Sequence, residues 1–118
     1  SRIMLVEVLK SKLHRVKVTQ ADLNYIGSIT IDEELLELVD LWPGQKVLIV
    51  SNTNGARLET YVIKGEKGSG EICLNGAAAH LINVGHEIII IGFHTTDNRD
   101  FRPKQILVDK ENKFIQYL

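Results

Sequence analysis

The sequence predicts a mainly β fold in which short strands build one barrel-like domain over residues 1–118. The length of 118 residues suits a single domain, and 44% hydrophobic residues provide enough apolar side chains for a core. Short β-rich runs recur between turn residues without an internal repeat, which is typical of a closed barrel. The expected strands cover residues 4–9, 13–19, 27–31, 46–51, 57–63, 71–74, 87–93, 105–109 and 113–117.

Only residues 32–41 have the pattern of a helix. Asp32 can cap its first turn, a leucine and valine stripe follows, and a Pro-Gly pair then ends it. Asn54-Gly55 lies between two β-rich runs and predicts a hairpin with a type I′ turn. We therefore expect residues 46–53 and 56–63 to pair.

Charge and cysteine content argue against several classes of protein. The 14 Lys and Arg balance 15 Asp and Glu, so the chain lacks the positive excess of a nucleic-acid binder. Cys73 is the only cysteine, which excludes an intrachain disulfide and a multi-cysteine metal site. We expect a cytoplasmic protein without a metal, a membrane span or a signal peptide, in which Ser1 to Ile3 precede Met4 as an added remnant or processed sequence.

Four segments carry residues that could do chemistry. Strand alternation puts Lys12 and His14 on one face with Val16 and Val18, which indicates either a polar pocket at a barrel mouth or a strand end in water. Gly27-Ser28 could let a hydroxyl reach the preceding carbonyl if the backbone is strained, although such a dipeptide is usually an ordinary loop.

The third segment is 57–61, where alternation puts Arg57, Glu59 and Tyr61 on one face and Thr60 on the other. Arg57 could bind a carboxylate and Tyr61 could transfer a proton. The alternative is a surface ion pair between Arg57 and Glu59 beside a packing tyrosine.

In the fourth segment, Asn75 opens a short helix over residues 75–80 as its cap. Small residues there leave backbone N–H groups free to hold a carboxylate, unless the segment is only a structural turn. His80, His86 and His94 lack metal-ligand spacing and are assigned no site.

Taken in order, these segments resemble the aspartate 1-decarboxylase family. The resemblance rests on five motifs and covers about Met4 to Phe93, with weaker likeness to Asp109. The motifs are Lys12 to Thr19, Asp22 to Ser28, Asn54 to Arg57, Thr60-Tyr61 and Asn75 to His80.

The resemblance implies a double-psi β-barrel with short helices, assembled as a homotetramer with active sites between neighbouring subunits. It also implies that the chain cleaves itself between Gly27 and Ser28, so that Ser28 becomes a covalent pyruvoyl cofactor. This group would form a Schiff base with L-aspartate and release CO₂ and β-alanine, a precursor of pantothenate and coenzyme A. Some family members need a maturation partner for this cleavage.

The resemblance assigns a role to each matching residue. Thr60 would assist self-processing by donating to the Gly27 carbonyl, and Tyr61 would return a proton to the α-carbon. The substrate would be bound by Lys12, His14, Tyr25, Arg57, Thr60, Asn75, Gly76, Ala77 and Ala78. Glu59 departs from the small hydroxyl residue frequent in the family and brings a negative charge near an anionic substrate.

The alternative to the enzyme is a non-catalytic barrel that binds a partner. The two differ at Ser28, because only the enzyme must break its chain there. A small transcription regulator is a third interpretation, and the near-neutral charge argues against it.

Overall fold

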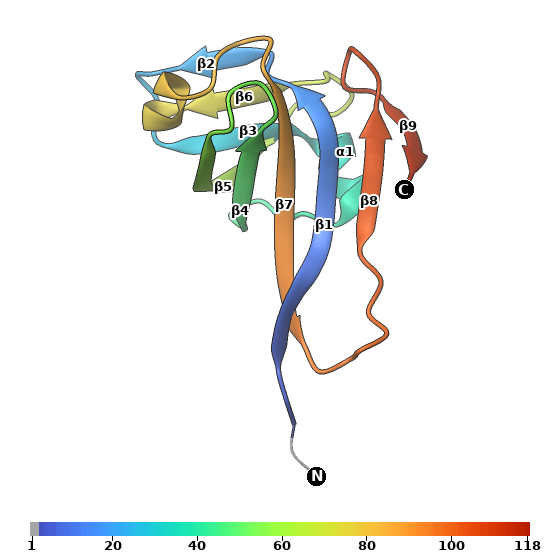
Figure 1. Cartoon of the computed structure of the whole chain (residues 1–118). Coiled ribbons are helices and arrows are strands. Elements are labelled where there is room, and N and C mark those ends of the chain that lie inside the picture. The colour runs from blue at the N-terminus through green and yellow to red at the C-terminus, as the bar shows by residue number, and fades with distance from the viewer. Residues whose placement is uncertain (1–2) are drawn as a thin grey trace.

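The computed structural model describes residues 3–118. Ser1 and Arg2, two of the three residues predicted to be an added remnant, therefore lie outside the described residues. Nine strands, one α-helix and one 3₁₀ helix follow one another along this part of the chain (Figure 1). They are β1 (Val6–Lys17), β2 (Gln20–Asp22), β3 (Ser28–Asp32), α1 (Glu33–Val39), β4 (Lys46–Ser51), β5 (Arg57–Gly65), β6 (Ile72–Asn75), η1 (Gly76–His80), β7 (Glu87–Thr96), β8 (Lys104–Val108) and β9 (Phe114–Tyr117).

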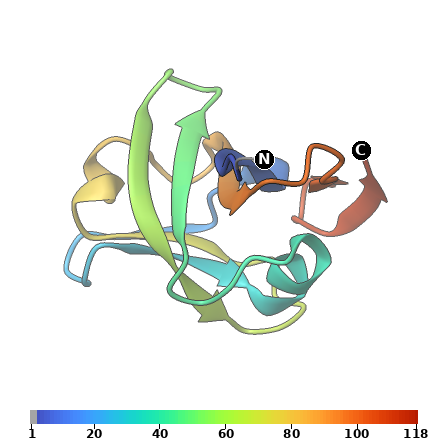
Figure 2. The same ribbon diagram turned by 90° about the horizontal axis from the view of Figure 1, so that it is seen from below.

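The strands are hydrogen-bonded in the order β2-β6-β3-β5-β4-β7-β1-β8-β9. The first half of β5 pairs antiparallel with β4 and its second half pairs parallel with β3, so β5 joins the two parts of the sheet. Figures 1 and 2 show this path from two directions. The predicted mainly β fold with short helices is confirmed, and the strand pairing is consistent with a double-psi barrel.

The core lies between these strands and α1. Isoleucine, leucine and valine side chains from almost every element meet there without exposure to solvent, because alternate strand positions point inward. The fully buried residues include Leu13, Ile29, Ile49, Ile88 and Ile106.

β1 differs from the prediction of two separate strands. It is one strand whose pairing with β7 shifts register between Leu9 and Ser11 and again between Leu13 and Val16. Arg15 has a φ of 65°, so the second irregularity is a bulge that reverses the alternation of side chains. Leu13 and Val16 are therefore both fully buried, and the prediction that Lys12 and His14 share a face with Val16 is wrong.

The predicted helix forms, capped as expected. The Asp32 carboxylate accepts a hydrogen bond from the backbone N–H of Glu34 at 2.8 Å. The same carboxylate accepts from the N–H groups of Gly68 and Gly70, which fastens the helix start to the loop after β5. The helix ends at Val39, earlier than the Pro-Gly pair predicts, because the C-cap residue Asp40 adopts a left-handed conformation.

β4 and β5 pair as predicted, but their connection is not a type I′ turn. Gly55 has a φ of 75°, whereas Asn54 does not have the positive φ that such a turn requires. Instead the N–H of Gly55 donates to the Ser51 carbonyl. The Ser51 hydroxyl accepts from the N–H groups of Thr53 and Asn54, which stabilises a wider turn.

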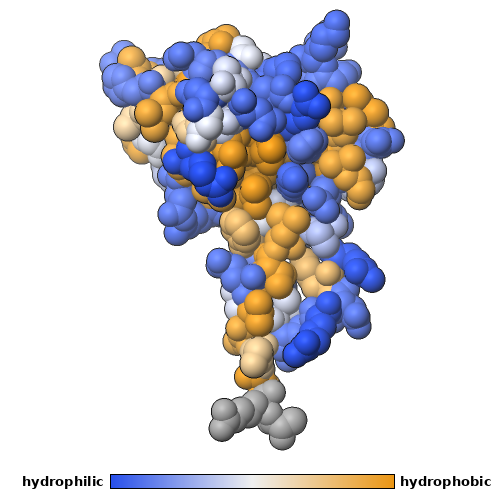
Figure 3. All heavy atoms as spheres, viewed as in Figure 1, coloured by the Kyte–Doolittle hydropathy of each residue, from blue (hydrophilic) through white to orange (hydrophobic). Residues whose placement is uncertain are grey.

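The start of β1 and the end of β7 extend beyond the rest of the sheet as a two-stranded arm (Figure 1). Apolar side chains lie along the surface of this arm (Figure 3). Met4 and Leu5, directly before β1, are 67% and 64% exposed. Within residues 3–118, no helix combines the length and apolar character needed to cross a membrane.

Candidate functional site

A pocket of about 460 Å³ lies beside the start of β3. It is formed by the loop before β3, the first half of β5 and the segment that joins β6 to η1. Its lining residues are Gly27, Leu58, Glu59, Thr60, Tyr61, Asn75, Ala77, Ala78 and Leu81. Six of the residues predicted for the site therefore share one pocket: Gly27, Thr60, Tyr61, Asn75, Ala77 and Ala78.

Ser28 lies directly behind this lining and is fully buried. It is the first residue of β3, and the antiparallel register places it opposite Asn75, the last residue of β6. The Ser28 hydroxyl donates to the Ile26 carbonyl at 3.1 Å and accepts from the Asn75 side-chain amide at 2.9 Å. Ser28, to which the family resemblance assigns the attacking hydroxyl, is thus held between a loop carbonyl and a strand side chain.

Asn75 precedes a short helix as predicted, but its side chain does not cap that helix. The amide turns inward, where its nitrogen donates to Ser28 and, at 3.1 Å, to the Thr30 hydroxyl. Its oxygen accepts from the Cys73 thiol at 3.2 Å. The expected cap is therefore wrong, because the hydroxyls of Ser28 and Thr30 on β3 accept the N–H groups of the amide.

The glycine with a left-handed backbone conformation is Gly76 and not Gly27. Gly27 has no positive φ, and a Cβ added to it would meet no atom within 4 Å. Gly76 has a φ of 70°, and a Cβ there would lie 2.8 Å from the Cα of Gly27. Glycine at position 76 therefore lets the start of η1 pack against the backbone of the expected cleavage site.

Thr60 and Tyr61 enter the pocket from β5. Within residues 3–118, no hydrogen bond links the Thr60 side chain to the Gly27 carbonyl, although both residues line the pocket. Tyr61 is 38% exposed, and Tyr25, in the loop before β3, is exposed and lies outside the pocket lining. The structure thus brings Thr60 and Tyr61 to Gly27 and leaves Tyr25 at the surface.

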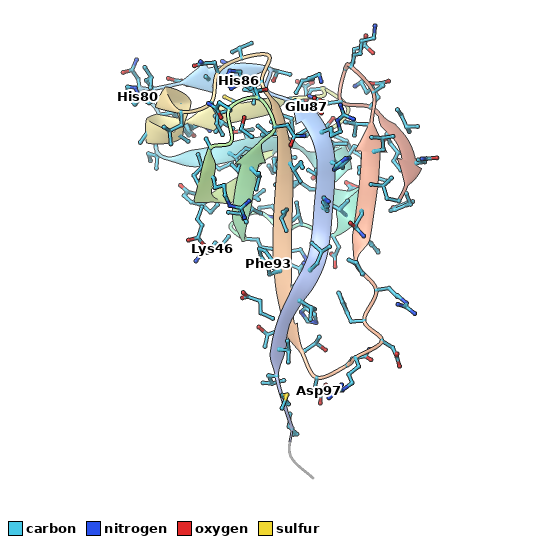
Figure 4. All side chains as sticks on the ribbon, viewed as in Figure 1. Lys46, His80, His86, Glu87, Phe93 and Asp97 are labelled. Atoms are coloured by element: carbon cyan, nitrogen blue, oxygen red, sulfur yellow. The ribbon has the colours of Figure 1, made fainter. Side chains whose placement is uncertain are left out.

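The predicted alternation along β5 holds, since Arg57, Glu59 and Tyr61 are all exposed. Glu59 pairs with Lys46 on β4 at 2.8 Å, so the predicted alternative of a pair with Arg57 is wrong. Figure 4 shows Lys46 at the lower end of β4. The Glu59 carboxylate raises the pKa of Lys46 through this hydrogen bond.

Lys12 and His14 lie on β1, away from the pocket. β4 and β7 separate β1 from β5 in the sheet, so one chain does not bring these residues to Ser28. The His14 Nδ1 atom is buried and has no hydrogen-bond partner. Burial lowers the pKa of His14, and the nearby charges of Lys12 and Arg15 lower it further.

Arg15 pairs with Glu87 at the start of β7. Figure 4 labels Glu87 at the upper end of the sheet. The hydrogen bond from Arg15 lowers the pKa of Glu87. The other histidines do not join the pocket: His86 accepts from the N–H of Asn83, and the His94 ring lies 4.8 Å from the Phe101 ring. Within residues 3–118, no three His, Cys, Asp or Glu side chains gather in a way that would hold a metal ion.

Sequence reasoning missed several residues at the site. Cys73 is buried as predicted, but its thiol also contacts Asn75, and Thr30 contacts the same amide. Lys46 neutralises Glu59, and Leu81 closes one wall of the pocket. Thr30 lies two residues from Ser28, and Cys73 lies two residues from Asn75, so each shares a strand face with its neighbour. This spacing indicates a common cluster only once β3 and β6 are known to pair.

Comparison with known proteins identifies the family of the chain. The family model described as aspartate decarboxylase matches residues 4–115. The chain is similar to a protein named aspartate 1-decarboxylase in Pelotomaculum thermopropionicum, with 54% identity over 96% of this chain and 88% of the relative. Relatives of the same name in Desulfitobacterium hafniense and Staphylococcus carnosus are 56% and 47% identical over 92% and 98% of this chain, and 88% and 93% of their own lengths.

The family match covers the β3 start, the first half of β5 and the β6–η1 segment, which together form the pocket. We therefore conclude that the chain belongs to the aspartate decarboxylase family.

Proposed function

We propose that this protein is a self-processing aspartate 1-decarboxylase that converts L-aspartate to β-alanine and CO₂ with a pyruvoyl cofactor made from Ser28. Family membership supports the reaction, and the names of the relatives support aspartate as the substrate. The observation that carries the proposal is the buried Ser28 hydroxyl, hydrogen-bonded to Asn75 and adjacent to a pocket that Gly27 and Tyr61 line.

Self-processing begins when the Ser28 oxygen attacks the Gly27 carbonyl carbon. The new C–O bond replaces the peptide C–N bond, and the hydroxyl proton passes to the nitrogen of Ser28. Negative charge collects on the Gly27 carbonyl oxygen during this attack, and a donor there typically accelerates such a step by about 10² to 10³. Thr60, which lines the same pocket, is the side chain that we assign to this role after a rotation of its hydroxyl.

The pocket suits a small ketoacyl group at position 28. Ser28 is enclosed by β6, the Asn75 amide offers a hydrogen-bond donor to an oxygen there, and the adjacent space can hold an amino acid. The pyruvoyl group supplies the electron sink for loss of the α-carboxylate. The chain itself then supplies a proton to the α-carbon from Tyr61, and backbone contacts from Gly76, Ala77 and Ala78.

The cationic residues point to a site shared between subunits. Arg57 is the exposed first residue of β5 and directly precedes the lining residues 58–61, although it is not itself part of the lining. Lys12 and His14 lie on β1, which β4 and β7 separate from β5. A carboxylate-binding Lys12 can complete the site only if it comes from a neighbouring chain. We therefore include in the proposal a cytoplasmic homotetramer with the active sites between subunits, matured in some settings by a partner protein.

Intact mass spectrometry under denaturing conditions tests the proposal, together with a β-alanine assay. We expect two fragments that meet at Gly27 and Ser28, with the larger lighter by one ammonia than a serine-headed fragment, and β-alanine formation from L-aspartate. Ser28→Ala should give one intact chain and no product. A wild-type chain that stays whole on warming and with cell extract, and forms no β-alanine, would support the non-catalytic barrel instead.

A further inference from the structure

We propose that Cys73 and Thr30 are positioning residues for self-cleavage, which act on Ser28 by fixing the orientation of the Asn75 amide. This inference rests on the proposed function, because it assigns Ser28 the role of nucleophile.

The four residues form a cluster across the β3–β6 ladder. Ser28 lies opposite Asn75 and Thr30 lies opposite Cys73 in the antiparallel register. Because the residues within each strand are two positions apart, all four side chains point to the same face. Ser28, Cys73 and Asn75 are each at most 5% exposed, so water does not compete for their hydrogen bonds.

Hydrogen-bond counting fixes how the Asn75 amide must point. The Ser28 hydroxyl has one proton and donates it to the Ile26 carbonyl, so from Asn75 it can only accept. The amide nitrogen has two N–H bonds, of which one goes to Ser28 and the other to Thr30. A flipped amide would place an oxygen against the Ser28 oxygen, which would then lose its N–H donor.

Cys73 supplies the donor that the amide oxygen needs. Its sulfur lies 3.2 Å from the Asn75 Oδ1 atom, and burial raises the pKa of the thiol, so the sulfur keeps its proton. Every hydrogen-bonding group of the amide is then paired. Removal of the thiol leaves a buried oxygen without a partner and lowers the cost of the flipped orientation.

The orientation matters because the same Ser28 oxygen reacts twice. In the first step it bonds to the Gly27 carbon and loses its proton to the departing nitrogen. In the second step a base takes the Cα proton of Ser28, and the electron pair of that C–H bond forms a Cα–Cβ double bond. The Cβ–Oγ bond breaks at the same time, and its electron pair stays on the oxygen, which becomes part of the Gly27 carboxylate. An N–H group aimed at this oxygen stabilises the charge that develops in the second step. Without it, the ester persists and water can hydrolyse it to a serine-headed fragment.

The test compares Cys73→Ala, Cys73→Ser, Thr30→Val and Thr30→Ser with the wild type in time-resolved intact mass spectra. For Cys73→Ala we expect cleavage to slow by roughly three- to tenfold, as loss of a partner to a buried polar group predicts. We also expect a larger share of serine-headed fragment. Thr30→Val should likewise slow cleavage and increase the share of serine-headed fragment. Cys73→Ser and Thr30→Ser, which keep a hydrogen-bonding group, should have a cleavage rate and a fragment ratio close to those of the wild type.

Ser11→Ala is the matched control. Ser11 is also fully buried, and its hydroxyl donates to the Val39 carbonyl at 2.6 Å on the α1 side of the core. This variant should lower the melting temperature without changing the ratio of fragment heads. The inference would be overturned if Cys73→Ala and Thr30→Val both cleaved at the wild-type rate and gave the wild-type ratio of fragment heads. It would also be overturned if Cys73→Ser showed the same defect as Cys73→Ala.

A second measurement does not depend on cleavage. In uncleaved chains, nitrogen-15 NMR can follow hydrogen exchange of the Asn75 side-chain amide, which we expect to be at least about tenfold faster in Cys73→Ala. Equal exchange would overturn the positioning role even in a protein that never cleaves. A wild-type chain that never cleaves or forms β-alanine, with exchange changed as expected, would refute only the proposed function.

Discussion

At the scale of single residues, the close approach of two glycines shapes the expected cleavage site. Gly76 holds a left-handed conformation against the Cα of Gly27, whereas Gly27 has open space where a side chain would begin. The two positions should therefore respond in opposite ways to the same substitution.

We predict that Gly76→Ala lowers the free energy of unfolding by about 2 to 4 kcal/mol, because the new methyl group would adopt an unfavourable φ and collide with backbone. Gly27→Ala should cost less than about 1 kcal/mol, since its methyl group meets nothing. Urea unfolding of both variants in the Ser28→Ala background, where the chain stays whole, measures the difference. Equal losses would contradict the packing described here.

His14 gives a second residue-scale prediction, on pH. Its pKa in the folded protein is lowered by burial, while the unfolded chain titrates near about 6.5. Between these two pKa values the unfolded state binds a proton that the folded state does not, so stability rises with pH in this window. The contribution of neutral His14 to stability is therefore complete above a pH of about 6.5 and is lost as the pH falls toward the lowered pKa of the folded protein.

Melting temperatures between pH 5 and pH 7.5 should therefore fall more steeply on acidification in the wild type than in His14→Gln. The stability contributed by the paired Glu87 is also lost in acid, but at lower pH, because its pKa is lowered from that of an ordinary glutamate by the hydrogen bond from Arg15. Parallel curves for the two proteins would show that His14 titrates alike in the folded and unfolded states.

At the scale of elements, the β4–β5 pair sets the charge of the pocket. Glu59 lines the pocket on β5, and Lys46 on β4 neutralises it from outside the lining. This pairing explains how an acidic residue fits beside an anionic substrate.

We predict that Lys46→Met raises the KM for L-aspartate by roughly three- to tenfold, because an unpaired Glu59 carboxylate repels the substrate. The kcat should change little, and added salt should reduce the effect. Lys46→Met combined with Glu59→Gln should return KM to near its wild-type value.

Lys67→Met is the control for this measurement. Lys67 forms a similar exposed ion pair with Glu37, 3.0 Å long, outside the lining of the pocket. Its removal should leave KM unchanged. A similar rise in both variants would point to overall charge and not to Glu59.

At the scale of the whole molecule, the separation of β1 from β5 predicts a site shared between chains. Lys12 and Tyr61 lie on strands that β7 and β4 separate, so a site that uses both draws them from different subunits.

Lys12→Ala and Tyr61→Phe chains should each be nearly inactive alone and should regain activity when coexpressed. If chains mix at random, about a quarter of the sites combine an intact Lys12 with an intact Tyr61. β-Alanine production should then approach about a quarter of the wild-type level. No recovery in demonstrably mixed assemblies would show that each site is built within one chain.

Several features could be predicted from short-range patterns. Asp32 caps α1 because a carboxylate followed by glutamates suits a helix start, and β4 pairs with β5 because the connecting residues favour a turn. The exposed face of Arg57, Glu59 and Tyr61 follows from the two-residue period of a strand. Each of these depends on residues that are close in the chain.

Other features could not be predicted in this way. The bulge at Arg15 reverses the faces of β1, and no local signal marks it because its cause is the register with β7. Asn75 has the sequence position of a helix cap, but its amide is taken by hydroxyls on β3. Glu59 pairs with Lys46 because the register of β4 and β5 brings them close.

The sequence alone thus determined the mainly β class, the positions of most strands and of the helix, and the motifs that carry the family resemblance. These follow from propensity, periodicity and residue identity, which act over a few residues. Only the tertiary structure decided which side chains meet: Ser28 with Asn75, Cys73 with the same amide, and Lys12 apart from the pocket. The physical reason is that strand pairing and register are set by burial across the whole core, so neighbours in space are distant in sequence.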